Sequence, residues 1–260
     1  MISAYDYPLA KIIDEANIDI VLIGDSLANV VLGLESTRDV GMNEMIHHAK
    51  AARRGVTQAL LIGDMPYEGY QADPSQAVAN AKRFIDEAGC EAVKVEWFDQ
   101  CLQVSQEIIA AGIPLMGHVG LTPQTAERLG GLKVQGKDAQ SAQAIIEHAK
   151  ALERIGCFSV VLECVPLEIA QMITEQLTIP TIGIGAGVYC DGQVLVIHDL
   201  LGLSSRQPKF VKQYADLNRM IAECVKQYQK DVLTGHFPNE TQSYHILASE
   251  LEKLKSGKIS

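Results

Sequence analysis

The sequence predicts an α/β protein, a (β/α)8 TIM-type barrel with additional C-terminal helices. Eight short apolar runs alternate with segments of helical periodicity along most of the chain. Several of these runs are continuous rather than alternating, which is typical of parallel strands buried on both faces. The length of 260 residues suits one such barrel, since the fold typically takes about 250 residues. An open doubly wound sheet is the alternative that this pattern leaves open.

The predicted strands end where glycine or polar residues interrupt the apolar runs. They cover residues 2–4, 20–23, 59–62, 92–95, 115–116, 159–162, 181–183 and 194–197. Helix signals fill the gaps between them. Pro8 opens the first helix, and Asn43 is expected to cap the helix that follows the second strand. Asp73 and Pro74 form an N-cap and a first helical position, and Gly89 ends that helix.

The rest of the chain is predicted to add helices to the same domain. One or two amphipathic helices are expected between residues 208 and 233, a turn at 235–240 and a further helix at about 247–255. The polar residues 253–260 are expected to fray. We therefore interpret residues 1–260 as one (β/α)8 barrel domain, with residues 208–260 as C-terminal helices and tail.

Composition and charge argue against several classes of function. The formal net charge is −10, and an acidic surface repels phosphates and anionic lipids, so neither nucleic acid nor membrane is an expected partner. An acidic protein with an anionic substrate needs local cations, either a metal or a lysine. The six scattered cysteines contain no CxxC pair and suit reduced core thiols. The chain lacks a signal-peptide pattern and an apolar run of about 18 residues, so a cytoplasmic location is expected.

Acidic residues follow three successive strands at the end where such a barrel places its active site. Asp25, Asp64 and Glu96 come after the second, third and fourth predicted strands. Carboxylates that converge at one mouth repel one another unless a cation lies between them. Oxygen ligands with room for water suit Mg²⁺ or a similar divalent ion. A single aspartate after a strand is more often a helix N-cap, but a repeated Ile-Gly-Asp favours a shared site.

Lys94, His118 and Glu163 are further candidates at the strand ends. Lys94 lies inside an apolar strand, so it faces the barrel mouth or pairs with an acid, unless it is simply solvated. Glu163 is flanked by apolar residues and must be ion-paired or functional, because an unpaired buried charge is costly. His118 is either functional or a hydrogen-bonded histidine at a strand end. The glycine-rich residues 183–187 lack the lysine of a P-loop and suit an anion site or a close backbone turn.

Short motifs spread from Ser3 to His245 carry a family resemblance. They include Gly24-Asp25-Ser26-Leu27, Asp64-Met65-Pro66, Val93-Lys94-Val95-Glu96, Gly117-His118-Val119-Gly120-Leu121-Thr122-Pro123-Gln124 and Leu162-Glu163-Cys164-Val165-Pro166. With these motifs in this order, the chain resembles the ketopantoate hydroxymethyltransferases, also called 3-methyl-2-oxobutanoate hydroxymethyltransferases. One departure is Trp97-Phe98, which stands where the family usually has Gly-Gly.

The resemblance implies a (β/α)8 barrel assembled into a large homo-oligomer, a decamer, with Mg²⁺ as cofactor and 5,10-methylenetetrahydrofolate as co-substrate. Carried over by position, the metal ligands would be Asp25, Asp64 and Glu96. The residues that contact the 2-oxo acid would be Asp25, Ser26, Asp64 and Lys94. Glu163 would be the catalytic base.

These roles lead to a hypothesis for the reaction. The carboxylate and keto oxygens of 3-methyl-2-oxobutanoate would chelate Mg²⁺, and Glu163 would remove the C3 proton to give an enolate. The enolate would attack the methylene carbon of 5,10-methylenetetrahydrofolate, and hydrolysis would give 2-dehydropantoate, a precursor of pantothenate and coenzyme A. Lys94 and Ser26 would hold the substrate carboxylate, and His118 would hydrogen-bond the substrate.

Three alternatives stay open at this point. A Mg²⁺-dependent 2-oxo-acid lyase or mutase of the phosphoenolpyruvate mutase/isocitrate lyase type uses a similar barrel, although the Lys-Lys-Cys-Gly-His loop of the lyases is absent here. A Schiff-base aldolase would use Lys94 as its nucleophile. A non-catalytic barrel that serves assembly or regulation is disfavoured, because the ionisable residues at the strand ends are all present.

Overall fold

The computed structural model describes residues 1–71, 73–204 and 207–257. The chain divides into two compact units, Met1–Tyr214 and Ala215–Ser260. The first unit holds the described β-strands and helices α1 to α9, and the second holds α10, η3 and α11. The end of the predicted tail, residues 258–260, lies outside the described residues.

The strands of the first unit form one parallel sheet in which each strand lies beside the next one in the chain. They are β1 Ile2–Ser3, β2 Ile20–Ile23, β3 Leu60–Asp64, β4 Ala92–Lys94, β5 Leu115–Gly120, β6 Ser159–Glu163, β7 Thr181–Ile184 and β8 Gly192–Gln193. A parallel bridge joins Ile2 to Leu195, just after β8, and Ser3 N donates to Leu195 O at 3.2 Å. The sheet therefore curls until its first strand meets the segment after its last, as in TIM-type α/β folds.

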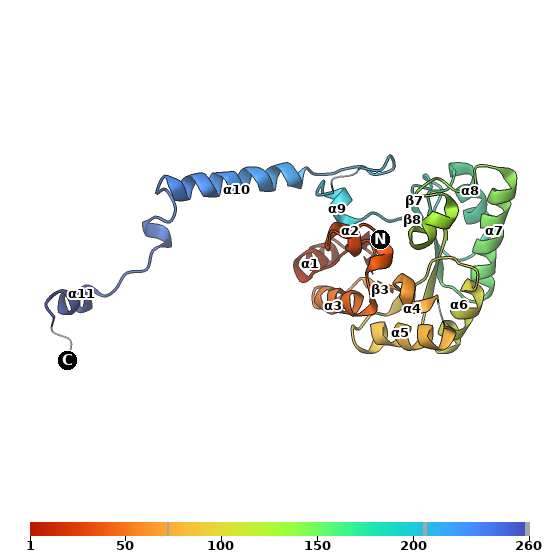
Figure 1. Ribbon diagram of the computed structural model, residues 1–260, viewed down its shortest axis with the longest axis horizontal. Coiled ribbons are helices and arrows are strands. Elements are labelled where there is room, and N and C mark those ends of the chain that lie inside the picture. The colour runs from red at the N-terminus through yellow and green to blue at the C-terminus, as the bar shows by residue number, and fades with distance from the viewer. Residues whose placement is uncertain (72, 205–206, 258–260) are drawn as a thin grey trace. The chain divides into compact units, whose positions relative to one another are not determined.

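Helices run around the outside of this unit, as α1, α3, α5, α6, α7 and α8 show in Figure 1. The helical segments are α1 Tyr7–Glu15, α2 Leu27–Val30, η1 Thr37–Asp39, α3 Met42–Arg53, α4 Tyr67–Tyr70, α5 Pro74–Asp86, α6 Cys101–Ala110, η2 Pro123–Leu129, α7 Ala139–Arg154, α8 Leu167–Gln176 and α9 Ile197–Leu200. The second unit contains α10 Leu217–Leu233, η3 Glu240–Gln242 and α11 Ala248–Lys255. No described helix is both long and apolar enough to cross a membrane.

Strand side chains alternate between two apolar layers. The outer layer packs residues such as Val21, Leu61 and Val93 against helix residues. The inner layer is built mainly from strand residues and therefore fills the inside of the curled sheet: Leu22, Ile62, Ala92, Met116, Val161, Ile182 and Val194. Because side chains alternate along a strand, a residue two positions beyond an inner-layer residue also faces inward.

Two strands differ from their predicted bounds. β5 runs to Gly120 rather than ending at residue 116, because Gly117 continues the strand where the sequence suggests a break. A Cβ at Gly117 would lie 2.7 Å from the Leu152 side chain of α7, so the glycine permits close packing of helix on sheet. The eighth strand lies at Gly192–Gln193, before the predicted 194–197. Within that apolar run only Leu195 bridges to β1, and Ile197 N bonds to Ser3 Oγ as α9 begins.

The predicted helix boundaries were partly wrong. Asp73 caps α5 as expected, by accepting from Ser75 N at 3.2 Å. The N-cap of α3 is Gly41, so the predicted cap Asn43 lies inside that helix. In the tail the helix begins at Leu217 rather than near residue 208, because Asp216 caps it through Arg219 N. All six cysteines are free, but Cys224 is exposed and is not a core thiol.

Asp14 fastens the end of α1 to the segment that enters β3. Its carboxylate is buried and accepts four hydrogen bonds of 2.8–3.0 Å, from Thr57 N, Thr57 Oγ1, Gln58 N and Ala59 N. Burial alone would raise the pKa of Asp14, but these donors outweigh it and lower the pKa to about 2. The bonds therefore favour the ionised form at this junction.

We expect Asp14→Asn to lower the free energy of unfolding by about 2–4 kcal/mol at neutral pH, because an amide nitrogen would face donors that the carboxylate now satisfies. Since the folded pKa of Asp14 lies below its usual value of 3.8, its contribution is present above that value and is lost as the pH falls toward about 2. Urea unfolding at a series of pH values measures both effects. The exposed Asp86→Asn is the matched control, and equal stability of the two variants would contradict the assignment.

Candidate active site

The alternation of strand residues brings the predicted site residues into the interior of the sheet. Asp64, Lys94, His118 and Glu163 each stand two positions beyond an inner-layer residue, namely Ile62, Ala92, Met116 and Val161. The register pairs Asp64 with Lys94 on neighbouring strands. These side chains therefore project from adjacent strands toward the same carboxyl-terminal end.

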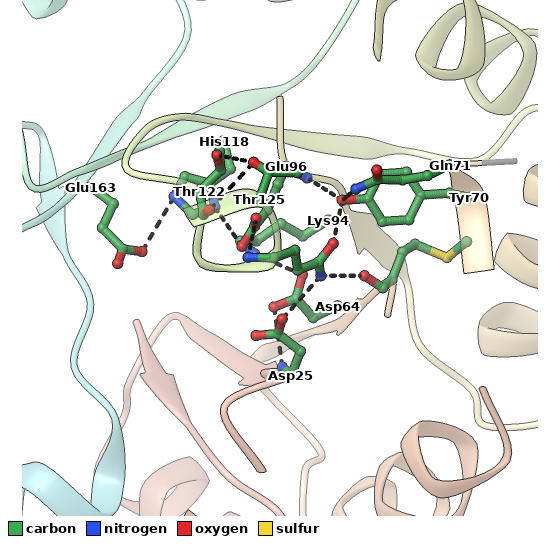
Figure 2. A network of polar contacts seen from close by, with 12 residues as sticks. Asp25, Asp64, Tyr70, Gln71, Lys94, Glu96, His118, Thr122, Thr125 and Glu163 are labelled. Carbon is green, nitrogen blue, oxygen red and sulfur yellow. Dashed lines mark hydrogen bonds and ion pairs between the residues drawn. The ribbon is translucent and has the colours of Figure 1, made fainter. Parts of the chain in front are cut away.

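A cavity of about 470 Å³ opens at this end of the sheet. Its lining includes every predicted site residue: Asp25, Ser26, Asp64, Lys94, Glu96, His118 and Glu163. Figure 2 shows one network of polar contacts that contains Asp25, Asp64, Lys94, Glu96, His118 and Glu163. Other lining residues from η1 and η2 lie along the same cavity, so it has room for more than a small 2-oxo acid.

Lys94 and Asp64 form a buried ion pair. Lys94 Nζ donates to Asp64 Oδ1 at 2.7 Å, and both side chains are at most 5% exposed. Burial alone would lower the pKa of Lys94, but Asp64, Glu96 and Asp25 outweigh it and raise the pKa. Lys94 is therefore a fixed positive charge. The alternative of a solvated lysine is excluded by its burial.

The buried acids at the cavity repel one another. Asp25 N donates to Asp64 Oδ2 at 3.3 Å, so the ends of β2 and β3 bring these two residues together. Burial raises the pKa of Glu96 well above its usual range, and the negative charge of Asp25 adds to the rise. Burial likewise raises the pKa of Asp64, an effect that Lys94 partly offsets. A cation between these carboxylates would relieve the repulsion.

The donor set has the chemistry that a hard divalent ion needs, although it is not preassembled. Among the described residues, no group of three or more histidine, cysteine, aspartate or glutamate side chains is already arranged to hold a metal ion. Mg²⁺ usually takes one or two protein carboxylates and completes its shell with water and substrate oxygens. Carboxylates from neighbouring strands beside an open cavity fit that mode of binding.

His118 lies between Glu96 and Glu163. Its Nδ1 is 3.6 Å from Glu96 Oε1 and its Nε2 is 3.3 Å from Glu163 Oε2. Figure 2 shows the ring between these two side chains. Neither contact has hydrogen-bond geometry, so both ring nitrogens are buried without a hydrogen-bond partner among the described residues. Burial and the charge of Lys94 lower the pKa of His118 well below its usual value, which makes the ring neutral. A neutral imidazole can donate one hydrogen bond and accept one.

Glu163 faces the cavity from the end of β6. Its side chain is 17% exposed, so it is shielded from bulk solvent but reaches the cavity. Burial raises the pKa of Glu163 to about 7, with Lys94 opposing part of the rise. A carboxylate with a raised pKa is a stronger base than an exposed glutamate and can still ionise near neutral pH.

Ser26 lies beside Asp25 and is held by a residue from the β1 side of the sheet. Its Oγ is 2.8 Å from the hydroxyl of the buried Tyr5. No role was predicted for Tyr5 from the sequence. It limits the positions that the Ser26 hydroxyl can take at the cavity wall.

Gln124 and Tyr70 are the main site residues that the sequence did not reveal. Gln124 is completely buried, and its side chain donates to Asp25 Oδ2 at 3.0 Å. The Tyr70 hydroxyl donates to Gln124 Oε1 at 2.6 Å. Gln124 occurs in a family motif, which was the available signal, but a neutral amide gives no sign in the sequence of whether it is buried.

Comparison with solved structures shows the class of fold. An oxaloacetate acetylhydrolase in complex with oxalate has a TM-score of 0.61 and 13% identity, and the match covers 99% of this chain and 91% of that one. A phosphonopyruvate hydrolase has a TM-score of 0.60 and 11% identity, with 99% and 89% covered. A 2,3-dimethylmalate lyase described as a PEP mutase/isocitrate lyase superfamily member has a TM-score of 0.59 and 13% identity, with 93% and 82% covered. At these identities the likeness concerns the fold alone.

Comparison with protein sequences is far more specific. The chain is 49% identical over 255 residues to the 3-methyl-2-oxobutanoate hydroxymethyltransferase of Syntrophomonas wolfei, covering 98% of this chain and 92% of that protein. It is 48% identical over 259 residues to the enzyme of the same name from Bacillus cereus, with 99% and 93% covered. The model of the family called Ketopantoate hydroxymethyltransferase matches residues 1–240. The chain therefore belongs to the ketopantoate hydroxymethyltransferase family.

Proposed function

We propose that this protein transfers a hydroxymethyl group from 5,10-methylenetetrahydrofolate to 3-methyl-2-oxobutanoate and so produces 2-dehydropantoate. The observation that carries the proposal is the position of Glu163, a glutamate with a raised pKa that faces the same cavity as a buried lysine and a group of acids. That arrangement suits removal of a proton next to a carbonyl group. The relatives that share 48–49% of their sequence with this chain are named for this activity. The reaction would take place in the cytoplasm.

A divalent cation, Mg²⁺ in this proposal, would be held by Asp25 and Glu96, with Asp64 as the third candidate ligand. When bound, it would stabilise negative charge that develops on the keto oxygen of the substrate. A phosphonopyruvate hydrolase of similar fold, with a TM-score of 0.57 and 12% identity, is a complex with oxalate and Mg²⁺. Oxalate resembles the 2-oxo acid end of the proposed substrate, which supports the choice of metal.

The remaining polar residues would bind and orient the 2-oxo acid. Lys94 supplies the positive charge that an anionic carboxylate needs in an otherwise acidic cavity. Ser26 offers a hydroxyl that Tyr5 orients. His118 carries two buried nitrogens without hydrogen bonds, and a substrate oxygen in reach of one of them would remove the cost of leaving it unpaired.

Glu163 would remove the proton from C3, the carbon next to the keto group. The electron pair of that C–H bond would form the new C–C bond to the methylene carbon of the folate. One of the two C–N bonds of that carbon would break at the same time, and its electron pair would stay on the folate nitrogen. Water would then cleave the remaining C–N bond. Its hydroxyl becomes the hydroxyl of the product and its proton goes to the folate nitrogen, so tetrahydrofolate is released. Lys94 is unsuited to the Schiff-base alternative, because its raised pKa keeps its amine protonated and non-nucleophilic.

Activity should depend on both substrates and on a divalent cation. We expect the purified protein to form 2-dehydropantoate, detected by mass spectrometry, from 3-methyl-2-oxobutanoate and 5,10-methylenetetrahydrofolate. Chelator should abolish turnover, and added Mg²⁺ should restore it. Full turnover in chelator would contradict the metal-dependent route, and trapping of Lys94 by borohydride would favour the aldolase.

Glu163→Gln should lower turnover by about 100- to 10,000-fold while substrate binding stays near normal, because the amide cannot accept the proton. In the unmodified protein, kcat/KM should rise as the pH increases through about 7, since Glu163 must lose its proton before it can act as a base. The residual activity of Glu163→Gln should lack this rise. Steady-state kinetics between mildly acidic and mildly basic pH tests both points, and unchanged turnover would remove Glu163 from the role.

We also propose that copies of this chain assemble into a large homo-oligomer, a decamer. Helix α10 has no buried residue, and apolar side chains recur along one of its faces at Met220, Ile221, Val225, Tyr228 and Val232. A continuous exposed apolar stripe of this kind supports burial against another protein surface.

Light scattering after gel filtration should give about ten times the mass of one chain. Replacing Val225 and Tyr228 together by Asp should reduce that mass, because two charges would be buried at the stripe. Lys226→Asp on the opposite face of α10 should leave it unchanged. A monomeric unmodified protein at micromolar concentration would refute the assembly.

A further inference from the structure

Gln124 occupies a central position among the buried acids although it carries no charge. Its side-chain nitrogen donates to Asp25 Oδ2 at 3.0 Å and to Met65 O at 2.9 Å. Its backbone nitrogen donates to Glu96 Oε2 at 3.0 Å. One residue of η2 thus holds one oxygen of each of two candidate metal ligands, which come from the ends of β2 and β4.

Tyr70 determines which way the Gln124 amide points. The Tyr70 oxygen accepts a hydrogen bond from Glu96 N at 3.2 Å, so its own hydrogen is free to go to Gln124 Oε1 at 2.6 Å. The partners on the other side are Asp25 Oδ2 and Met65 O. The Met65 carbonyl oxygen can only accept hydrogen bonds, and so can the Asp25 carboxylate when it is ionised. The amide therefore has a single orientation that satisfies every partner.

The two carboxylates are left with one bound and one available oxygen each. Within the described part of the chain, Asp25 Oδ1 and Glu96 Oε1 have no hydrogen bond, while Asp25 Oδ2 and Glu96 Oε2 are both held by Gln124. Both side chains line the cavity. A carboxylate fixed through one oxygen and free at the other is prepared to bind a cation.

The segment that departs from the usual family pattern contributes to the same network. Phe98 is buried, and its ring packs edge-on against Tyr70, with 5.4 Å between ring centroids and an interplanar angle of 77°. The Trp97 ring stacks on the ring of His148 in α7, with 3.8 Å between their centroids. Phe98 therefore helps to fix the tyrosine that orients Gln124.

We propose that Gln124, oriented by Tyr70, is a positioning residue that sets Asp25 and Glu96 for a divalent cation. This inference rests on the proposed function, because it assumes that these carboxylates bind the metal. Gln124 itself touches neither cation nor substrate in this role. It acts by holding the two acids in place and by donating hydrogen bonds that reduce their mutual repulsion.

Cation affinity of the free protein separates positioning from simple structural support. Mn²⁺ can be followed by electron paramagnetic resonance without any turnover, in full-length protein with no substrate. Gln124→Met keeps the size of the side chain and removes its hydrogen bonds. Tyr70→Phe keeps the ring that packs on Phe98 and removes only the hydroxyl. The matched control is Gln143→Met on the exposed face of α7, where the amide donates a hydrogen bond to Glu147 Oε1 at 3.1 Å.

We expect the Mn²⁺ Kd to rise about 10- to 100-fold in Gln124→Met and to be unchanged in Gln143→Met. Tyr70→Phe should raise it about three- to tenfold, because the amide loses the bond that orients it. Circular dichroism shows which variants are folded, and the Mn²⁺ Kd is compared among the folded variants alone. A structural role alone would lower the melting temperature of Gln124→Met without changing the Kd of the folded protein.

A folded Gln124→Met with a Kd within about twofold of the unmodified protein would overturn the inference, since such residues typically contribute tenfold or more. If Gln124→Met does not fold, an unchanged Kd in Tyr70→Phe would overturn it instead. Absence of Mn²⁺ binding to the unmodified protein would refute the cation site itself, and the inference with it. That result is distinguishable from normal binding that the variants leave unaffected.

Discussion

The charge balance around the Lys94–Asp64 ion pair is the constraint on which the rest of this site depends. One buried ammonium group lies among Asp25, Asp64 and Glu96, so the lysine offsets only part of their negative charge. Excess negative charge in a poorly solvated space raises the pKa of the acids, as burial and Asp25 do for Glu96. The same imbalance attracts a divalent ion. Burial also raises the pKa of Glu163, so its basicity and the demand for a cation share a physical origin.

A neutral side chain is well suited to organise such a site. A lysine or arginine at the position of Gln124 would offset the negative charge on Asp25 and so weaken its attraction for a metal ion. The amide supplies directed hydrogen bonds with no net charge, and Tyr70 removes its freedom to turn over. Phe98 extends this arrangement into the segment where the chain departs from the usual pattern of its family. Phe98 of this departing segment packs on Tyr70, whose hydroxyl in turn bonds Gln124 Oε1 and Glu96 N.

Much of the fold and most of the candidate site could be predicted because the sheet buries both faces of its strands. Continuous apolar runs mark such strands, and an ionisable residue at the end of one, such as Asp64 or Glu163, is conspicuous. The eighth strand was misplaced because the run after Gln193 is apolar throughout, so hydrophobicity does not show where pairing stops and α9 begins. Gln124 was missed for a related reason. A buried amide differs from an exposed one only through its partners, and these come from distant parts of the chain.

The two-residue alternation along the strands limits which insertions and deletions this protein can tolerate during evolution. Lengthening β6 by one residue before Glu163 would turn its carboxylate outward into the helical layer and expose the interior to a different side chain. Lengthening it by two would restore the facing but lift the group by about 7 Å, beyond reach of a substrate held by the other strands. Insertions and deletions within the strands are therefore expected to be strongly selected against. Diversity within this architecture must accumulate in the loops and helices around the cavity, such as the segment that carries Trp97 and Phe98.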